Sequence, residues 1–338
     1  MLYDEKMAFL YLERLFLEID SYNIEKVSTI YLGGGTPSSL NTEMLTLLLK
    51  KIRPFLDEGG EFSVEINVEN TNFEKLQLLK SYGVNRLSIG VQSTNDAICK
   101  FLNRQHTFED VKKVVKEARM LGFYSINLDL IYGISLQSKK VLQTDIDNLL
   151  SLHPEHISIY SLTVHPNTVF YLKGINEQNQ DDSRDDYDLI LNSLRKAGYD
   201  RYEISNFAKP GFRSRHNLTY WLNEEYYGVG MGASGYVDGV RYDNTRNMCK
   251  YLQGFYRSSE EKITIEDEEK YFWMLNLRLE DGFEIQEYVN RFGTELLLKR
   301  EETLHDEINN GLMIKLKNRI KLGDDGLMIL DRILLKII

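Results

Sequence analysis

Two carboxylates, Glu65 and Asp129, stand in segments whose apolar and polar side chains alternate. Residues 62–67, 87–92 and 126–130 each show this alternation, and successive side chains of a β-strand point to opposite faces. Each segment therefore predicts a strand with one apolar and one polar face. The polar positions are Ser63, Glu65, Asn67, Ser88, Gly90, Gln92, Asn127 and Asp129.

A polar face on such strands needs an explanation, because parallel strands covered on both faces are usually apolar throughout. An unpaired buried carboxylate costs several kcal/mol. The pattern therefore favours a polar cavity at the carboxyl ends of the strands, where α/β proteins bind ligands. The alternative is a structural hydrogen-bond network or a sheet with one wet face. An aldolase-like barrel is disfavoured, because we expect no lysine or histidine on the polar face.

A glycine-rich loop at 33–37, with the sequence GGGTP, directly follows a further predicted strand at 27–32. Consecutive glycines let a ligand approach the backbone closely, and their amides can donate hydrogen bonds to a carboxylate. The loop lacks the Gly-Lys-Ser/Thr sequence of a P-loop, so it predicts no nucleotide-phosphate site. A tight turn between strand and helix is the alternative interpretation.

One of the six histidines, His216, lies among large aromatic side chains in the run HNLTYW. A neutral imidazole can ligate haem iron, and flanking aromatic rings can stack on the macrocycle. His216 is therefore a candidate haem ligand, with an aromatic packing cluster as the alternative. The two cysteines, Cys99 and Cys249, are far apart and predict neither a disulfide framework nor a clustered thiolate site.

Strands and helices alternate through the first half of the sequence, which predicts parallel strands joined by right-handed crossovers. We expect a full or partial (β/α) barrel, or an open doubly wound sheet. Thr107 and Asp110 are spaced like a helix capping box. The predicted strands are 27–32, 62–67, 86–91, 125–132 and 156–162, and the predicted helices are 5–22, 42–52, 73–82, 107–121 and 139–152.

The alternation weakens beyond Thr163, and three regions are predicted from it. Residues 1–170 form the partial barrel, 171–264 a connecting region that contains His216, and 265–338 a helical C-terminal domain. The end of the chain, 311–338, has the pattern helix, two short strands, helix. This pattern predicts a winged-helix-like domain.

The composition disfavours nucleic-acid and membrane proteins. The 338 residues carry a net charge of −10 and no long basic run. No apolar run reaches the roughly 18 residues that a membrane-spanning helix needs, and the residues after Met1 do not resemble a signal peptide. We expect a cytoplasmic protein with a packed core and no integral membrane segment.

Most of the chain resembles, in order and spacing, the HemW branch of the oxygen-independent coproporphyrinogen III oxidase family, within the radical S-adenosylmethionine (SAM) superfamily. The resemblance lies in the segments YLGGGTP, FSVEINVENT, GVNRLSIGVQS, FLNRQH, INLDLIYG and HISIYSLT, and, for HemW in particular, YEISNFAKPG, HNLTYW and YYGVGMGASGY. It implies a partial radical-SAM-type (β/α)6 barrel, a family C-terminal domain, and a haem chaperone that hands haem to apo-haemoproteins.

The resemblance also assigns residues. It makes His216 the haem-iron ligand, because the HNxxYW motif is associated with haem binding in this branch. Five of the implied SAM-contacting residues are glycine-loop residues or carboxylates that the sequence pattern already singles out. The implied SAM contacts are Gly34, Gly35, Thr36, Glu65, Gln92, Arg104, Asp129 and Thr163.

The chain departs from the family in lacking the CxxxCxxC loop, whose thiolates hold a [4Fe–4S] cluster, and the first barrel strand. Neither Cys99 nor Cys249 can substitute, and the strand at 27–32 would have an exposed edge. Ser135 replaces the family's usual proline, which we expect to loosen that loop. Because a polar pocket without a ligand carries a desolvation cost, we expect an in-frame CxxxCxxC upstream of Met1. A natural remnant is the alternative.

Three functions follow from the resemblance. The first is a haem chaperone with a SAM-binding barrel. The second is a radical SAM enzyme resembling oxygen-independent coproporphyrinogen III oxidase, in porphyrin biosynthesis, which the absent cysteines disfavour. The third is a clusterless, truncated remnant that binds SAM or haem without chemistry. Enzymatic activity and oligomeric state are left open by the sequence.

Overall fold

The computed structural model describes residues 4–166 and 168–337, which form two compact units. The sheet unit comprises Glu25–Arg201 and Ser205–Arg213. The terminal unit comprises the residues up to Ile24, Tyr202–Ile204 and Ser214–Ile338. Both units are assembled from discontinuous segments, and the division of the sequence into three regions stays a prediction.

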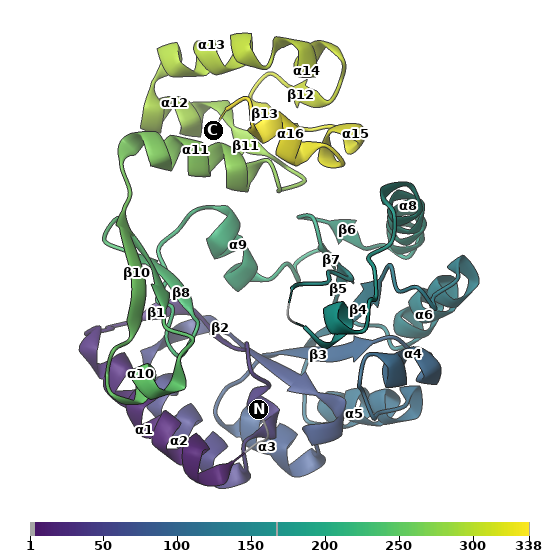
Figure 1. Ribbon diagram of the computed structural model, residues 1–338, viewed down its shortest axis with the longest axis vertical. Helices are drawn as coiled ribbons and strands as arrows, with labels where there is room; N and C mark the ends of the chain where they lie inside the picture. The colour runs from purple at the N-terminus through teal and green to yellow at the C-terminus, as the bar shows by residue number, and fades with distance from the viewer. Residues whose placement is uncertain (1–3, 167, 338) are drawn as a thin grey trace. The chain divides into compact units, whose positions relative to one another are not determined.

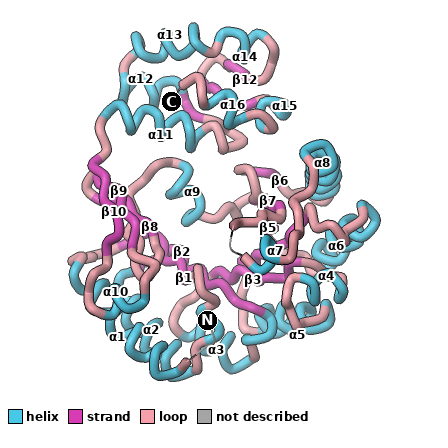
Figure 2. Tube along the Cα trace, in the orientation of Figure 1, coloured by secondary structure: helices cyan, strands magenta, loops and turns pink. Residues whose placement is uncertain are grey.

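The sheet unit is built on seven strands in the order β1-β2-β3-β4-β5-β7-β6 (Figures 1 and 2). Strands β1 to β5 are parallel and adjacent in sequence order, which confirms the predicted α/β class. Strands β7 and β6 continue the sheet antiparallel. The strands are β1 (Val27–Leu32), β2 (Leu56–Asn67), β3 (Arg86–Gln92), β4 (Ser125–Tyr132), β5 (His156–Ser161), β6 (Asp200–Arg201) and β7 (Asn206–Ala208).

Helices pack on the apolar face of this sheet. Val64, Leu87 and Leu128, at the centres of three strands, are fully buried. The predicted capping box is present at the start of α5, where Asp110 accepts a hydrogen bond from the Thr107 amide at 2.8 Å. The helices are α2 (Thr42–Ile52), α3 (Phe73–Ser81), α4 (Asp96–Phe101), α5 (Phe108–Met120), α6 (Lys139–Ser151), α7 (Val169–Leu172) and α8 (Gln180–Lys196), with 3-10 turns η1 (Pro37–Ser39), η2 (Arg53–Phe55) and η3 (Val68–Asn70).

The terminal unit contains two three-stranded antiparallel sheets, with the orders β10-β9-β8 and β11-β13-β12. Its strands are β8 (Ser234–Val237), β9 (Val240–Asn244), β10 (Arg257–Lys262), β11 (Phe283–Glu284), β12 (Met313–Lys315) and β13 (Arg319–Leu322). Its helices are α1 (Glu5–Ser21), α9 (Arg215–Trp221), α10 (Met248–Leu252), α11 (Ile265–Asn276), α12 (Ile285–Phe292), α13 (Thr294–Thr303), α14 (His305–Asn309), α15 (Asp324–Leu327) and α16 (Leu330–Leu334).

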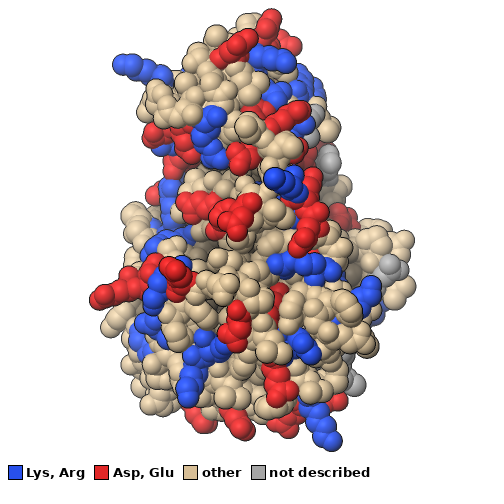
Figure 3. Space-filling model, turned by 90° about the vertical axis from the view of Figure 1, so that its left-hand side faces the viewer, with Lys and Arg blue, Asp and Glu red and all other residues tan. Residues whose placement is uncertain are grey.

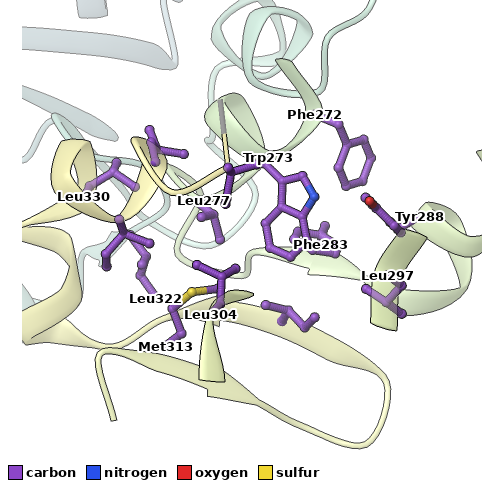
Figure 4. Packing of buried hydrophobic residues seen from close by; sticks show 14 residues of the cluster. Phe272, Trp273, Leu277, Phe283, Tyr288, Leu297, Leu304, Met313, Leu322 and Leu330 are labelled. Carbon is purple, nitrogen blue, oxygen red and sulfur yellow. The ribbon is translucent and has the colours of Figure 1, made fainter. Parts of the chain in front are cut away.

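The C-terminal end of this unit has its own hydrophobic core (Figure 4). Trp273 is fully buried, and its ring meets Phe283 edge-on with a centroid distance of 4.9 Å. Within 311–338 the two predicted short strands are β12 and β13, and helices α15 and α16 follow them. The helix predicted before the strands in this range lies earlier in the chain, because α14 ends at Asn309. Strand β11 pairs with β13 and adds a third strand that the sequence pattern did not indicate.

A buried carboxylate joins helix α1 to distant parts of the terminal unit. Glu18 is fully buried. Its Oε2 accepts hydrogen bonds from the Gly230 amide at 2.9 Å and the Tyr251 hydroxyl at 2.6 Å. Its Oε1 accepts one from the Asn244 side-chain amide at 2.6 Å. The carboxylate is thus balanced by donors, as a buried charge requires.

Across residues 4–166 and 168–337, no helix is both long and apolar enough to cross a bilayer. The face in Figure 3 mixes acidic and basic side chains, and no broad single-sign patch is seen on it. This view agrees with the absence of a basic run in the sequence.

Candidate functional site

A pocket of about 340 Å³ lies at the carboxyl-terminal ends of the parallel strands. Its volume falls within the range of roughly 300–1,000 Å³ that small-molecule sites occupy. The glycine loop and the polar faces of β2, β3 and β4 form most of its wall. The lining residues are Tyr31, Gly34, Gly35, Thr36, Glu65, Ile66, Asn67, Ser88, Gly90, Gln92, Arg104, Asp129 and Tyr160.

Glu65 ties the glycine loop to the sheet. Its Oε1 accepts a hydrogen bond from the Tyr31 hydroxyl at 2.6 Å, and its Oε2 accepts one from the Gly34 amide at 3.0 Å. Burial and the Glu65 charge raise the pKa of Tyr31 far above its usual value, so the phenol stays protonated and keeps donating. The carboxylate therefore shapes the loop as well as lining the pocket.

Asp129, on β4, is the second carboxylate of the pocket. The Asn127 side-chain amide donates to its Oδ1 at 2.7 Å, and the Ser88 hydroxyl donates to its Oδ2 at 3.3 Å. Burial raises the pKa of Asp129 to about 6, opposed by the hydrogen bond from Asn127, and the nearby Glu65 charge adds to the rise. The group is mostly ionised at neutral pH, at a cost in folding free energy.

A buried histidine continues this network deeper into the sheet. His156, on β5, is fully buried, and its Nδ1 lies 2.6 Å from the Asn127 side-chain oxygen. Since the Asn127 amide group donates to Asp129, its oxygen faces His156, and Nδ1 carries the proton. Burial, with a contribution from the Arg86 charge, holds the pKa of His156 well below its usual range. The ring is therefore neutral.

His156 corrects one expectation from the sequence. We expected no lysine or histidine on the polar face of the sheet, and this was wrong. His156, Ser158 and Tyr160 alternate with two isoleucines along β5, so the histidine shares the face of Tyr160, which lines the pocket. This alternation is visible in the sequence, and it extends the predicted polar face by one strand beyond 126–130. The ring lies in a hydrogen-bond network and does not line the pocket.

Gln92 and Arg104 also line the pocket. Gly90 lies beneath them, because a Cβ placed there would sit 2.9 Å from Gln92 Nε2 and 3.8 Å from an Arg104 guanidinium nitrogen. The loop that carries Arg104 is anchored by His106, whose Nδ1 lies 3.0 Å from Glu69 Oε1 and whose Nε2 lies 3.1 Å from the Val91 carbonyl.

Seven of the eight implied SAM-contacting residues line this one pocket, and Thr163 does not. Thr163 is exposed just beyond the end of β5. Tyr31 and Tyr160 also line the pocket but were not singled out from the sequence. A tyrosine is an apolar ring with one polar hydroxyl. In an alternating pattern it therefore marks a polar face less clearly than a carboxylate does.

The glycine at position 33 is required by close packing, and we expect Gly33→Ala to destabilise the protein by about 1–3 kcal/mol. An added Cβ would sit 2.4 Å from the Tyr31 ring and 2.7 Å from the Glu65 carboxylate. Gly35→Ala is a matched control, because a Cβ there meets nothing within 4 Å. Denaturant unfolding of both variants measures the difference, and equal stabilities would contradict this account.

His216 lies in the terminal unit, on α9, where Ser214 caps the helix by accepting from the Asn217 amide. Its Nε2 is 2.7 Å from the Tyr220 hydroxyl, one helical turn further on. The Tyr220 ring meets Tyr226 edge-on with a centroid distance of 4.6 Å. Burial, with a smaller effect of Tyr226, raises the pKa of Tyr220 to about 12, so its phenol is neutral.

The two cysteines do not fit an iron–sulfur cluster. Cys99 is buried in the sheet unit and Cys249 is exposed in the terminal unit. Burial raises the pKa of Cys99 to about 11, so it is a thiol and not the thiolate that metals bind. In the part of the chain that the structure describes, no three His, Cys, Asp or Glu side chains are grouped to hold a metal ion.

Comparisons with known proteins agree with this architecture. A family model described as the radical SAM superfamily matches residues 3–144. The heme chaperone HemW of Lactococcus lactis subsp. lactis (strain IL1403) is 37% identical over 325 residues, which cover 94% of this chain and 86% of that protein. The chain belongs to the HemW family. HemW of Bacillus subtilis (strain 168) is 38% identical over 313 residues, covering 89% of this chain and 82% of that protein.

The fold of this HemW-family chain is also that of a solved structure. Coproporphyrinogen III oxidase (HemN) from Escherichia coli, described as a radical SAM enzyme, superposes with a TM-score of 0.86 at 20% sequence identity. The match covers 99% of this chain and 84% of that one. The family resemblance and the fold class predicted from the sequence are thereby confirmed, and the radical SAM match spans β1 to β4.

Proposed function

We propose that this HemW-family chain binds haem through His216 and transfers it to apo-haemoproteins. The observation that carries the proposal is the setting of His216: a partly buried imidazole beside Tyr220 and, through it, Tyr226. An imidazole is a common haem-iron ligand, and neighbouring rings can pack on the porphyrin. The relatives named heme chaperone HemW, similar over most of the chain, support the same function.

We also propose that the pocket of the sheet unit binds SAM. The ligand carries an ammonium, a sulfonium and a carboxylate, and therefore a net positive charge. Glu65 and Asp129 supply two negative charges and Arg104 one positive charge, so the pocket complements that net charge. The amides of Asn67 and Gln92 can bond the ribose or the adenine. Electrostatics and hydrogen-bonding groups thus fit this ligand.

When a cluster donates an electron, SAM supplies a radical, and three thiolates are needed to hold that cluster. The described residues contain only Cys99 and Cys249, which the fold keeps in different units. We therefore propose ligand binding for the pocket and assign no radical step to these residues.

Titration with ferric haem tests the chaperone proposal. We expect a saturable shift of the Soret band at one haem per chain. When an apo-haemoprotein is added, we expect the Soret band of its haem-bound form to appear. Transfer should need contact between the proteins, so a dialysis membrane between them should slow it to the rate of haem loss. A spectrum that does not saturate, or haem that never leaves, would contradict the chaperone function.

A further inference from the structure

The backbone at Gln92 adopts a conformation that is rare for a residue with a side chain. Its φ is +67°, and the Ser93 amide donates to the Val91 carbonyl at 2.8 Å, which closes a three-residue turn around Gln92. Such a left-handed residue costs about 1–3 kcal/mol and persists only where its surroundings hold it. The pairing of β3 with β4 also shifts between Gly90 and Gln92. The turn directs Gln92 into the pocket wall.

A buried carboxylate outside the pocket holds this turn. Asp145, on α6, is fully buried. Its Oδ1 accepts hydrogen bonds from the Thr94 amide at 2.7 Å and the Thr94 hydroxyl at 2.6 Å. Its Oδ2 accepts from the Ser93 hydroxyl at 2.9 Å and from Gln137 Nε2 at 3.1 Å. Three of these four bonds come from the two residues that follow Gln92.

Other contacts support the turn but do not replace Asp145. His106 Nε2 lies 3.1 Å from the Val91 carbonyl, and the Cys99 thiol lies 3.0 Å from the Ser93 carbonyl. The Asn148 side-chain amide donates to the Thr94 hydroxyl at 2.8 Å. Among the contacts of Ser93 and Thr94, those to Asp145 are made to a carboxylate, and hydrogen bonds to charged groups are the stronger ones.

We propose that Asp145 is a positioning residue of the SAM pocket: it fixes Ser93 and Thr94 so that the strained turn keeps the Gln92 amide in the wall. The proposal rests on SAM binding by this pocket. Asp145 is absent from the lining of the pocket, and Ser93, Thr94 and Gln137, which donate hydrogen bonds to it, are absent from the lining as well. Its charge therefore acts on the ligand indirectly, by preorganising Gln92.

Hydrogen exchange measured by mass spectrometry tests the hold on the turn. Asp145→Leu keeps the branched arrangement of the side-chain heavy atoms but removes both acceptors, and we expect the amides of 92–95 to exchange at least about tenfold faster. Asp145→Asn is the conservative control. Its oxygen can still accept from Thr94, and the Gln137 Oε1, which has no hydrogen-bond partner in the described structure, can accept from the new amide. We expect its exchange to stay close to that of the parent chain.

A double-mutant cycle tests the link to the ligand. With calorimetric titration of SAM, Asp145→Leu should weaken binding about tenfold in the parent chain and less than about twofold in a Gln92→Ala background. Equal weakening in both backgrounds would mean that Asp145 acts through general stability, and would overturn the proposal. Thr94→Val, nearly isosteric and lacking one donor to Asp145, should give a smaller loss of the same kind if Asp145→Leu does not fold.

The two experiments separate the two proposals. Faster exchange at 92–95 without measurable SAM binding by the parent chain would overturn SAM binding, and with it the role of Asp145 there. SAM binding with unchanged exchange in Asp145→Leu would overturn only the positioning role.

Discussion

Replacing His216 by alanine is expected to weaken haem binding at least tenfold, equal to about 1.4 kcal/mol. Groups that merely orient a metal ligand are worth roughly 10–100-fold in metal affinity, and loss of the ligand itself should be no smaller. The side chain is partly buried on α9 and hydrogen-bonded to Tyr220, so its removal leaves a small surface gap and an intact helix. Haem titration followed at the Soret band measures the effect, with thermal unfolding to confirm the fold.

Two variants make this result specific to His216. Tyr220→Phe removes the hydroxyl that occupies His216 Nε2 and keeps the ring that packs on Tyr226. We expect it to bind haem as well as the parent chain, or more tightly. His305→Ala removes an exposed histidine that also has a partner one turn away, since His305 Nε2 lies 2.7 Å from Asn309 Nδ2. It should leave the spectrum unchanged. If His216→Ala retains its haem affinity and Tyr220→Phe loses it, the iron ligand is Tyr220 and not His216.

Asp129→Asn is expected to raise the free energy of unfolding at pH 7 by about 1–3 kcal/mol. The folded-state pKa of Asp129 is raised to about 6, against roughly 3.9 for an unfolded chain. Protonated Asp129 therefore favours the folded state below about pH 4, and this stability is lost as the pH rises through 6. The asparagine keeps the shape and removes the charge that burial penalises.

The pH dependence gives the sign of the effect. The difference in unfolding free energy between Asp129→Asn and the parent chain should grow from pH 4 to pH 7 and then level off. Using the difference cancels the titration of all other groups. Asp147→Asn, an exposed carboxylate of α6, should change the stability at pH 7 by less than about 0.5 kcal/mol. If the difference in unfolding free energy is the same at pH 4 and pH 7, the charge of Asp129 does not destabilise the folded state. The same change should weaken SAM binding, because it removes a negative charge that complements the positively charged ligand. The charge that favours binding is thus the one that lowers folding stability.

Much of the sheet unit was predictable because its signals are local. The strands predicted at 27–32 and 125–132 have those bounds in the structure, and alternation along β2, β3 and β4 located the polar wall. A charged side chain on an otherwise apolar strand is costly, so its presence already indicates a pocket or a network. In this protein the two charged side chains indicate a pocket and a network together, since Glu65 and Asp129 line the pocket and also accept hydrogen bonds from neighbouring residues.

The parts that sequence patterns did not indicate depend on contacts between distant segments. Asp145 looks like an ordinary polar residue of an amphipathic helix, and only the fold places it under the turn at Gln92. The left-handed backbone at Gln92 has no sequence signature, because it is imposed by neighbours and not by a glycine. The antiparallel β7 is three residues long, too short for a period to appear.

The fully buried Glu18 constrains the order in which parts of the chain can fold during synthesis. Helix α1 precedes the sheet unit in the chain, yet its Glu18 carboxylate accepts a hydrogen bond from Tyr251, 233 residues later. At roughly 5–20 residues per second, the ribosome needs on the order of 10–50 s to supply that partner. Meanwhile the sheet unit, whose strands pair with their sequence neighbours, can form. The Glu18 carboxylate therefore stays without this partner while the sheet unit forms, and α1 completes its packing only after Tyr251 has been made.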